Sequence, residues 1–332
     1  MKRIALYLVL ILVNVVALEL LLSVYFFQRR GDYPSAIVHY AVHQIERLRI
    51  AVDHGTEQGI GIYKDDPELG FDNLANASGK HKTSEFAVTY TIDAEKGRRI
   101  PAPERPRGRI YFLGCSYTFG WGVEDNQNYP YLLATKHWAD WEVKNRSVNG
   151  WGTVHAYLVL RKELEKISGP AIFIYGITPD HIPRNYIRKE WITSLAKSNR
   201  KHPYFDLNEG VLKFHGTVGV LESKQGDEEV RRKELELTSA FLVAMHRLSS
   251  ERNIPFIVIL LPQKHRVAWG WNDWPPEKVK VLVENRIPFL DLTEMKERLD
   301  YIKYDVHPTA RGHELIADAI ARSFVSDVVK KR

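Results

Sequence analysis

The sequence predicts an α/β fold of three layers, in which helices cover both faces of a mostly parallel central sheet. From residue 109 to the C-terminus, short apolar runs alternate with segments of helical spacing, and this alternation is typical of parallel sheets. Ser116 directly follows the first run, and His307 follows the last one. Sites in such sheets form at the carboxyl ends of the strands, so these loops are the places to look for function.

The elements are expected in a regular order. The strands are continuous runs rich in β-branched and aromatic residues, predicted at 109–113, 141–148, 171–175, 255–261 and 288–292. The helices have apolar residues three and four positions apart and are predicted at 127–138, 154–167, 228–252, 275–285 and 311–327. The segment 177–227 interrupts this order and is expected to be an irregular insertion with strand-like pieces such as 210–214. The predicted domain occupies 108–332.

An apolar run at 4–27 precedes the domain and is long enough for a membrane-spanning helix, which needs about 20 residues. We expect it to be a signal anchor in the inner membrane, with residues 1–3 in the cytoplasm and the body outside it. The alternative is a signal peptide cleaved after Ala17. Glu19 lies within the run, and a carboxylate in a membrane is costly. One reading is that Glu19 contacts a partner membrane protein. The other is that it stays protonated or reaches the membrane–water interface.

Residues 28–107 are expected to form a juxtamembrane helix at 36–53 and an irregular N-terminal extension. The extension contains one strand candidate at 86–92. Three prolines between residues 101 and 106 predict a stiff linker in front of the domain.

Composition excludes two classes of protein. The net charge of +6 is spread along the chain, and the basic run 231–233 has glutamates around it, so nucleic-acid binding is not expected. Cys115 is the only cysteine among 332 residues, so no intrachain disulfide can form.

Two motifs carry the predicted chemistry. Gly114-Cys-Ser-Tyr-Thr-Phe-Gly120 presents Ser116 after a strand, and Asp305-Val-His307-Pro308 places an acid and a base near the C-terminus. These are the parts of a serine-hydrolase triad. The structural alternatives are a helix-capping role for Ser116 and a packing role for His307. His313 follows a glycine at a helix start and is expected to be structural, and no third ligand completes a metal site with it.

The motifs resemble those of the SGNH/GDSL hydrolase family, over about residues 105–328. Residues 114–122 resemble the first block of that family, with Cys115 where an acidic residue often stands. Asn145-Arg-Ser-Val-Asn-Gly150 resembles the second block, and 305–308 resembles the last. The membrane anchor resembles that of bacterial cell-envelope members. The family implies a flavodoxin-like order of strands and no cofactor or metal.

The resemblance implies a role for each motif residue. Ser116 is the expected nucleophile, His307 the base and Asp305 the residue that orients it. The amides of Ser116 and Gly150 are expected to form the oxyanion hole, together with Thr178, which stands where the family has asparagine. The substrate-binding candidates are Cys115, Asn149, Asp180, His181, Arg184 and Asn185. Of these, His181 is equally well explained as a loop histidine with internal partners.

The sequence therefore predicts a membrane-anchored serine esterase or O-acyltransferase. Its expected substrate is a small ester or an ester-bearing glycan of the cell envelope. Five tryptophans, which can stack on sugar rings or simply pack, lie in loops at 121, 151, 269, 271 and 274. The alternative from another class is a catalytically degenerate accessory protein that binds glycan or a membrane partner, and a weaker one is a lipase-like enzyme.

Overall fold

The central sheet has five parallel strands in the order β11-β10-β7-β5-β6. The strands are β5 (Arg109–Gly114), β6 (Glu142–Asn145), β7 (Ala171–Ile177), β10 (Phe256–Leu260) and β11 (Phe289–Asp291). The chain leaves β5 toward β6 and then crosses to β7 on the other side. The order of strands reverses there, and in open α/β sheets ligands bind beside such a reversal, at the carboxyl ends of the strands, here β5 and β7.

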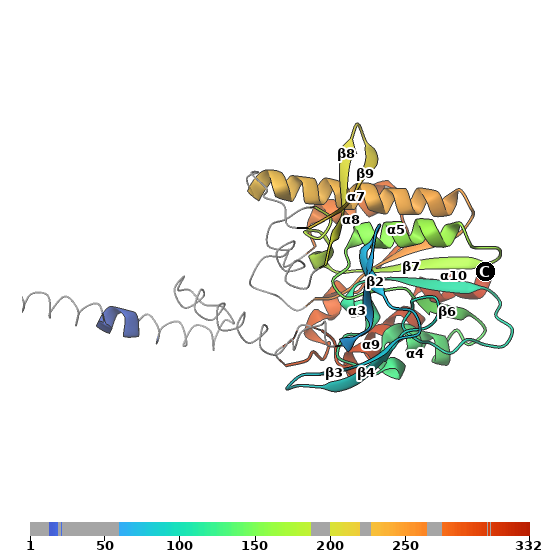
Figure 1. The fold of residues 1–332 in the computed structure, drawn as a ribbon, viewed down its shortest axis with the longest axis horizontal. Helices are drawn as coiled ribbons and strands as arrows, with labels where there is room; N and C mark the ends of the chain where they lie inside the picture. The colour runs from blue at the N-terminus through green and yellow to red at the C-terminus, as the bar shows by residue number, and fades with distance from the viewer. Residues whose placement is uncertain are drawn as a thin grey trace, which may run out of the picture. The chain divides into compact units, whose positions relative to one another are not determined.

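Figure 1 shows the computed structural model, in which we describe residues 13–18, 21, 60–186, 200–219, 227–263, 274–303, 305 and 307–332. Residues 1–55 and 56–332 are two separate units. In the first unit, residues 13–18 of the predicted anchor are helical. The structure also describes residue 21 of the predicted anchor. The remaining anchor residues and the whole predicted helix 36–53 lie outside the described residues. Within the described part of the chain, no helix combines the length and the apolar character needed to cross a membrane.

Alternating side chains of the strands build two apolar cores, one on each face of the sheet. On β5, Tyr111 and Leu113 enter one core, and Ile110 and Phe112 enter the other. The first core is covered by α5 (Thr153–Leu164), α7 (Asp227–Ser250) and α8 (Pro276–Glu284). The second is covered by α4 (Tyr129–Lys136), α9 (Ala310–Ala321) and α10 (Phe324–Lys331). Figure 1 shows α5 and α7 above the sheet and α4 and α9 below it. The predicted three-layer fold is confirmed.

Two predicted segments differ from the structure in their regularity. The helix expected at 311–327 is divided into α9 and α10, because Ser323 caps a new helix by accepting the N–H of Val325. The insertion contains a regular antiparallel hairpin of β8 (His202–Asn208) and β9 (Val211–Val218). The hairpin packs on α7 through the rings of Phe205 and Phe241, 5.2 Å apart. Residues 187–199 and 220–226 of the insertion lie outside the described residues.

The N-terminal extension is more ordered than its sequence suggests. It forms two antiparallel pairs, β1 (Tyr63–Asp66) with β2 (Gly70–Asn73) and β3 (Ser78–Lys82) with β4 (Ala87–Thr91). The strand expected at 86–92 is thereby confirmed as β4. Tyr90 and Ile92 share an apolar cluster with Phe119 and Trp121, which follow β5. The extension and the segment from residue 108 onward thus bury side chains against each other and belong to one compact unit, residues 56–332.

The buried histidine of α9 predicts a loss of stability in acid. Burial, with smaller effects of Arg98 and His307, lowers the pKa of His313 to about 3. The unfolded chain takes up that proton near pH 6.5, so between these values it binds more protons than the folded chain. The free energy of unfolding should then fall by up to about 1.4 kcal/mol per pH unit from this group alone.

A variant separates this contribution from that of the carboxylates. His313→Asn retains an acceptor for the backbone N–H of Tyr129, which His313 Nδ1 accepts at 3.3 Å. The stability difference between wild type and variant, measured by urea unfolding, should shrink as the pH falls from 7 to 4. Parallel pH curves for the two proteins would contradict the assignment.

Candidate active site

Three side chains from two distant loops form one hydrogen-bonded chain. His307 Nε2 lies 2.6 Å from Ser116 Oγ, and His307 Nδ1 lies 2.5 Å from Asp305 Oδ1. Asp305 Oδ1 also accepts the backbone N–H of His307 at 3.0 Å. Ser116 and His307 are 7% and 8% exposed, so the pair is largely shielded from water yet still reaches the surface. The structure brings together the three residues that the sequence selected.

The two contacts of the imidazole determine where its proton lies. An ionised carboxylate only accepts hydrogen bonds, so Nδ1 of His307 carries the proton that faces Asp305. Nε2 is then the basic nitrogen, and it accepts the hydroxyl proton of Ser116. This is the tautomer that a general base needs in order to activate a serine.

Ser116 is positioned by close packing at the ends of two strands. This serine begins the one-turn helix α3 (Ser116–Phe119), directly after β5. Gly114 of β5 pairs with Gly176 of β7. A Cβ on Gly114 would lie 2.3 Å from Thr118 Oγ1, and one on Gly176 would lie 2.5 Å from the same atom. The two glycines therefore allow Thr118 to lie directly on the strands, where it accepts the hydroxyl of Tyr129 at 2.9 Å.

Backbone hydrogen bonds close the turn that carries the acid and the base. The N–H of Ile302 donates to the carbonyl of His307 at 3.0 Å, and the N–H of Asp305 donates to the carbonyl of Ile302 at 3.2 Å. Thr309 then caps α9 by accepting the N–H of Gly312 at 3.2 Å. The position of His307 is thus determined by the start of α9 and not by its own side chain alone.

Besides Ser116, the expected oxyanion residues are Gly150 and Thr178, which lie in the loops after β6 and β7. The N–H of Val148 contacts the carbonyl of Gly114 at 3.4 Å, so the loop to Gly150 begins beside the end of β5. Gly150 has a φ of +82°, a left-handed conformation that favours glycine. The Oγ1 of Thr178 is buried and has no hydrogen-bond partner among the described residues. A buried hydroxyl without a partner is costly, which makes it a candidate donor to a bound oxyanion.

Two of the expected substrate contacts remain accessible. The side chains of Asp180 and Arg184 are 16% and 12% exposed and form an ion pair at 3.7 Å. Arg184 also donates to the carbonyl of Trp151 at 3.1 Å, next to Gly150. Both stay candidates for substrate contact beside the oxyanion loop.

Three other candidates are buried and engaged in packing. Cys115, His181 and Asn185 are 1%, 0% and 2% exposed. Cys115 belongs to an apolar core. His181 Nδ1 lies 2.6 Å from the hydroxyl of Tyr175, and burial lowers the pKa of this histidine well below its ordinary value. Asn185 donates to Thr238 on α7 at 2.7 Å. This corrects the expectation that the three residues line the substrate site.

Asn149 and the loop tryptophans also have structural roles. Asn149 is 2% exposed and donates to the hydroxyl of Tyr63 at 2.6 Å, so it joins β1 to the loop of Gly150. Trp121 and Trp151 are 3% and 0% exposed, which corrects the idea that they form a sugar platform. Trp274 packs partly buried on the first core, and residues 269 and 271 lie outside the described residues.

Sequence reasoning did not single out two residues of the extension that contact the turn after α3. Arg98 donates to the carbonyls of Phe119 and Gly120, and Tyr90 accepts the N–H of Gly122. Tyr90 showed only the alternation of a strand, and Arg98 stood in an unpatterned segment. No local signal could have found them, because their partners lie more than 20 residues away.

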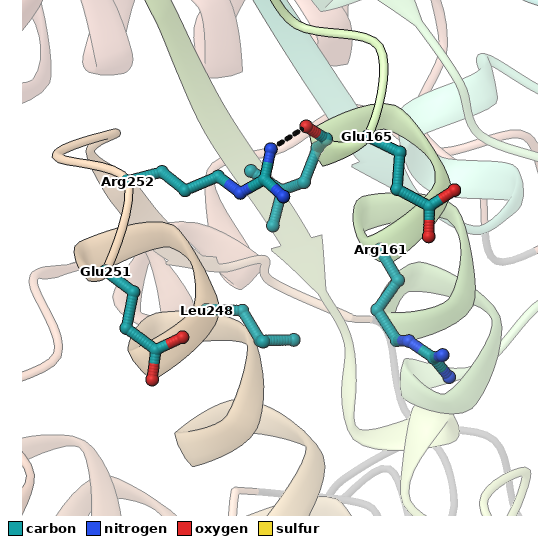
Figure 2. A pocket seen from close by; sticks show the side chains of 6 residues that line it. Arg161, Glu165, Leu248, Glu251 and Arg252 are labelled. Carbon is teal, nitrogen blue, oxygen red and sulfur yellow. Dashed lines mark hydrogen bonds between the residues drawn. The ribbon is translucent and has the colours of Figure 1, made fainter.

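A surface groove is lined by residues other than those of the triad. Figure 2 shows it between the C-terminal ends of α5 and α7, where Arg252 donates to the carbonyl of Leu164. Its lining residues are Arg161, Leu164, Glu165, Leu248, Glu251 and Arg252. The arginines and glutamates balance in charge, and none of the triad residues takes part. Within the described parts of the chain, no group of three or more His, Cys, Asp or Glu side chains is placed to bind a metal ion.

No protein-family description and no curated protein sequence matches this chain. The structure is similar to solved structures of lipolytic enzymes. For the psychrotrophic esterase EstA from a Pseudoalteromonas species, the identity is 13% and the TM-score 0.40, over 66% of this chain and 98% of that chain. For a G-D-S-L family lipolytic protein from Veillonella parvula, the values are 15% and 0.40, over 66% and 98%.

A GDSL-like lipase from Bacteroides thetaiotaomicron is 14% identical with a TM-score of 0.39, over 67% of this chain and 88% of that chain. Likenesses this distant carry no functional argument. The function proposed below rests on the geometry of the triad.

The glycine contact beneath the nucleophile can be tested by one added methyl group. Gly176→Ala would place its Cβ 2.5 Å from Thr118 Oγ1 and 2.6 Å from the hydroxyl of Tyr129. Because both neighbours are buried, we expect a destabilisation of about 1–3 kcal/mol, measured by urea unfolding. Gly219→Ala is the control, since a Cβ there meets no atom within 4 Å. Equal stability of the two variants would contradict the packing argument.

Proposed function

We propose that this chain is a serine esterase or O-acyltransferase that works through Ser116, His307 and Asp305. The single observation that supports it is the continuous hydrogen-bonded chain from Ser116 Oγ through both ring nitrogens of His307 to Asp305 Oδ1. A capping role for Ser116 would not need an imidazole at 2.6 Å. A packing role for His307 would not need a carboxylate on its other nitrogen.

The proposed reaction has two acyl-transfer steps. In the first, Ser116 Oγ attacks the ester carbonyl and its proton moves to His307 Nε2. The tetrahedral intermediate then collapses, and the bond to the alcohol breaks as the alcohol takes the proton from Nε2. In the second step, water or another hydroxyl attacks the acyl-enzyme and transfers its proton to Nε2. Release of an acid or a new ester returns the proton to Ser116.

Asp305 keeps the charge of this cycle balanced. When His307 takes the serine proton, the imidazolium that forms lies between Ser116 and an acceptor 2.5 Å from Nδ1. The pair is shielded from bulk water, which strengthens the attraction between imidazolium and carboxylate. Asp305 therefore stabilises the charged base and holds its ring in one orientation.

The oxyanion of each intermediate needs donors on the side of the ester oxygen. We assign them to the amides of Ser116 and Gly150 and to the hydroxyl of Thr178. The buried Oγ1 of Thr178 has no hydrogen-bond partner in the described part of the chain, which supports this assignment because a hydroxyl is both donor and acceptor. Each well-placed donor is worth about 3–4 kcal/mol in the transition state.

The substrate proposed is a small ester or an acylated glycan outside the cytoplasm, reached by an anchored body. The apolar run at 4–27 supports the location, and Asp180 with Arg184 offers polar contacts near Gly150. The burial of Trp121 and Trp151 removes two aromatic platforms from the argument for sugar. The rival proposal, an accessory binding protein without catalysis, rests on the threonine at 178.

Replacing the nucleophile should abolish the reaction. Ser116→Ala should lower hydrolysis of p-nitrophenyl acetate by at least about 1,000-fold, because the variant lacks the hydroxyl on which the acyl-enzyme is proposed to form. A fluorophosphonate probe should label the wild type at Ser116 and leave the variant unlabelled. The control is Ser250→Ala, at the exposed end of α7, which should react like the wild type. Undiminished turnover by Ser116→Ala, or a folded wild type that the probe does not label, would refute the proposal.

The third oxyanion donor can be removed without changing the shape of the side chain. Thr178→Val should lower kcat by about 100-fold with little change in KM, because the donor acts on the intermediate more than on the bound ester. Thr178→Ser, which keeps the hydroxyl, is the matched control and should retain most of the rate. If valine and serine variants have equal kcat, the hydroxyl takes no part.

A further inference from the structure

Arg98 of the N-terminal extension is fully buried against the turn that follows the nucleophile helix. Its Nη1 donates to the carbonyls of Phe119 at 2.8 Å and Gly120 at 2.5 Å, and its Nη2 donates to the carbonyl of Val123 at 2.6 Å. Its Nε donates to Asp125 at 2.9 Å. One guanidinium thus satisfies carbonyls along the whole turn 119–123, including the C-terminal carbonyls of α3.

Two neighbouring aromatic rings, with centroids 5.1 Å apart, also pack against the guanidinium. The ring centroids of Tyr90 and Phe119 lie 4.7 Å and 4.9 Å from Arg98 Cζ. The hydroxyl of Tyr90 also accepts the N–H of Gly122 at 2.9 Å and lies 3.0 Å from His81 Nδ1. The extension therefore binds the turn through hydrogen bonds of two residues, Arg98 and Tyr90. Neither residue belongs to a strand of the five-stranded central sheet.

The turn that Arg98 holds lies against the base of the triad. The ring of Trp121 lies 6.1 Å from the imidazole of His307, between centroids. Trp121 also packs against His81, with 4.2 Å between the ring centroids. A Cβ on Gly122 would lie 2.4 Å from Ile302 Cδ1, in the loop that carries Asp305. A shift of the turn would therefore move the surroundings of His307.

Burying the Arg98 guanidinium is costly unless all of its donors have hydrogen-bond partners. Burial lowers the pKa of Arg98, with Asp125 opposing that shift, and a buried guanidinium is tolerated only when its donors are paired. Lysine cannot reproduce the arrangement, because it has one nitrogen where arginine presents a planar fork. The three carbonyls and the carboxylate lie around that fork, so the contact favours one position of the turn.

From these contacts we infer that Arg98 is a positioning residue of the active site. It acts through the turn 119–123, which keeps Trp121 against His307 and the imidazole within reach of Ser116 Oγ. Arg98 itself touches neither the triad nor the ester. This inference rests on the proposed function for its effect on rate, and on the packing alone for its effect on the turn.

The matched experiment compares two arginines of the extension. Arg98→Lys and Arg98→Met are set against Arg107→Lys and Arg107→Met. Arg107 is 39% exposed at its side chain and pairs with Asp140 at 3.7 Å, away from the turn. The full chain is used, and all assays run well below the lowest Tm in the set, so that each variant stays folded.

The first measurement is the rate constant of labelling by a fluorophosphonate, with kcat and KM for p-nitrophenyl acetate. We expect Arg98→Met to lower the labelling rate and kcat by about 10- to 100-fold, since a displacement of about 1 Å costs up to that much. KM should change little, because Arg98 does not contact the ester. Arg98→Lys should lie between wild type and Arg98→Met, and both Arg107 variants should match wild type.

The second measurement is hydrogen exchange of the backbone amides of 119–123, which does not depend on activity. Exchange should accelerate in the Arg98 variants and stay unchanged in the Arg107 variants. If Arg98→Met does not fold, Arg98→Lys gives the same test, together with Tyr90→Phe, which removes the hydroxyl that accepts the Gly122 N–H and contacts His81 Nδ1. The inference would be overturned if the Arg98 variants were labelled and turned over substrate at wild-type rates. It would also be overturned if amide exchange of 119–123 were unchanged and only the Tm fell. Arg98 would then be a purely structural residue.

The two proposals fail in different ways. A wild type that the probe does not label refutes the proposed enzyme, while faster exchange in the Arg98 variants would still show that Arg98 holds the turn. A wild type that reacts, with Arg98 variants that react equally fast, refutes only the positioning role.

Discussion

The parallel pairing of β5 with β7 is the constraint on which the candidate site depends. Gly114 and Gly176 are partners at the ends of these strands, and neither tolerates a Cβ without a clash with Thr118. Because the side chain of Thr118 can lie directly against both glycines, α3 begins immediately after β5 and places Ser116 at the carboxyl end of that strand. The same pairing places Thr178 two residues beyond the partner of Gly114. Nucleophile and proposed oxyanion donor are thus placed by one backbone contact.

The extension before the sheet supports both sides of the site. Arg98 and Tyr90 bind the turn after the nucleophile, and Tyr63 accepts a hydrogen bond from Asn149 in the loop of Gly150. These contacts are buried and polar, so each is stable only when all its partners are present. A sheet with its helices would supply the strands and the triad residues. The extension adds the contacts that limit where the loops between them can move.

The burial of the site bears on its chemistry. Ser116 and His307 are nearly covered, and the imidazole has a carboxylate on one nitrogen and a hydroxyl on the other. A shielded pair favours chemistry in which water enters only as a reactant, which suits either hydrolysis or transfer to another hydroxyl. In the proposed reaction, the choice between these two depends on which acceptor reaches the acyl-enzyme.

Local patterns in the sequence determined the order of strands and helices along the chain and, from it, the three layers. Short motifs identified the triad residues. Both kinds of signal act within a few positions of the chain. The sequence did not reveal which polar residues would be buried. His181 and Asn185 look like site residues in the chain but bond to Tyr175 and Thr238 inside the fold. Arg98 stands in a segment without a recognisable pattern but contacts the nucleophile turn. Only the tertiary structure decided these roles, since each depends on partners brought close by packing between distant segments.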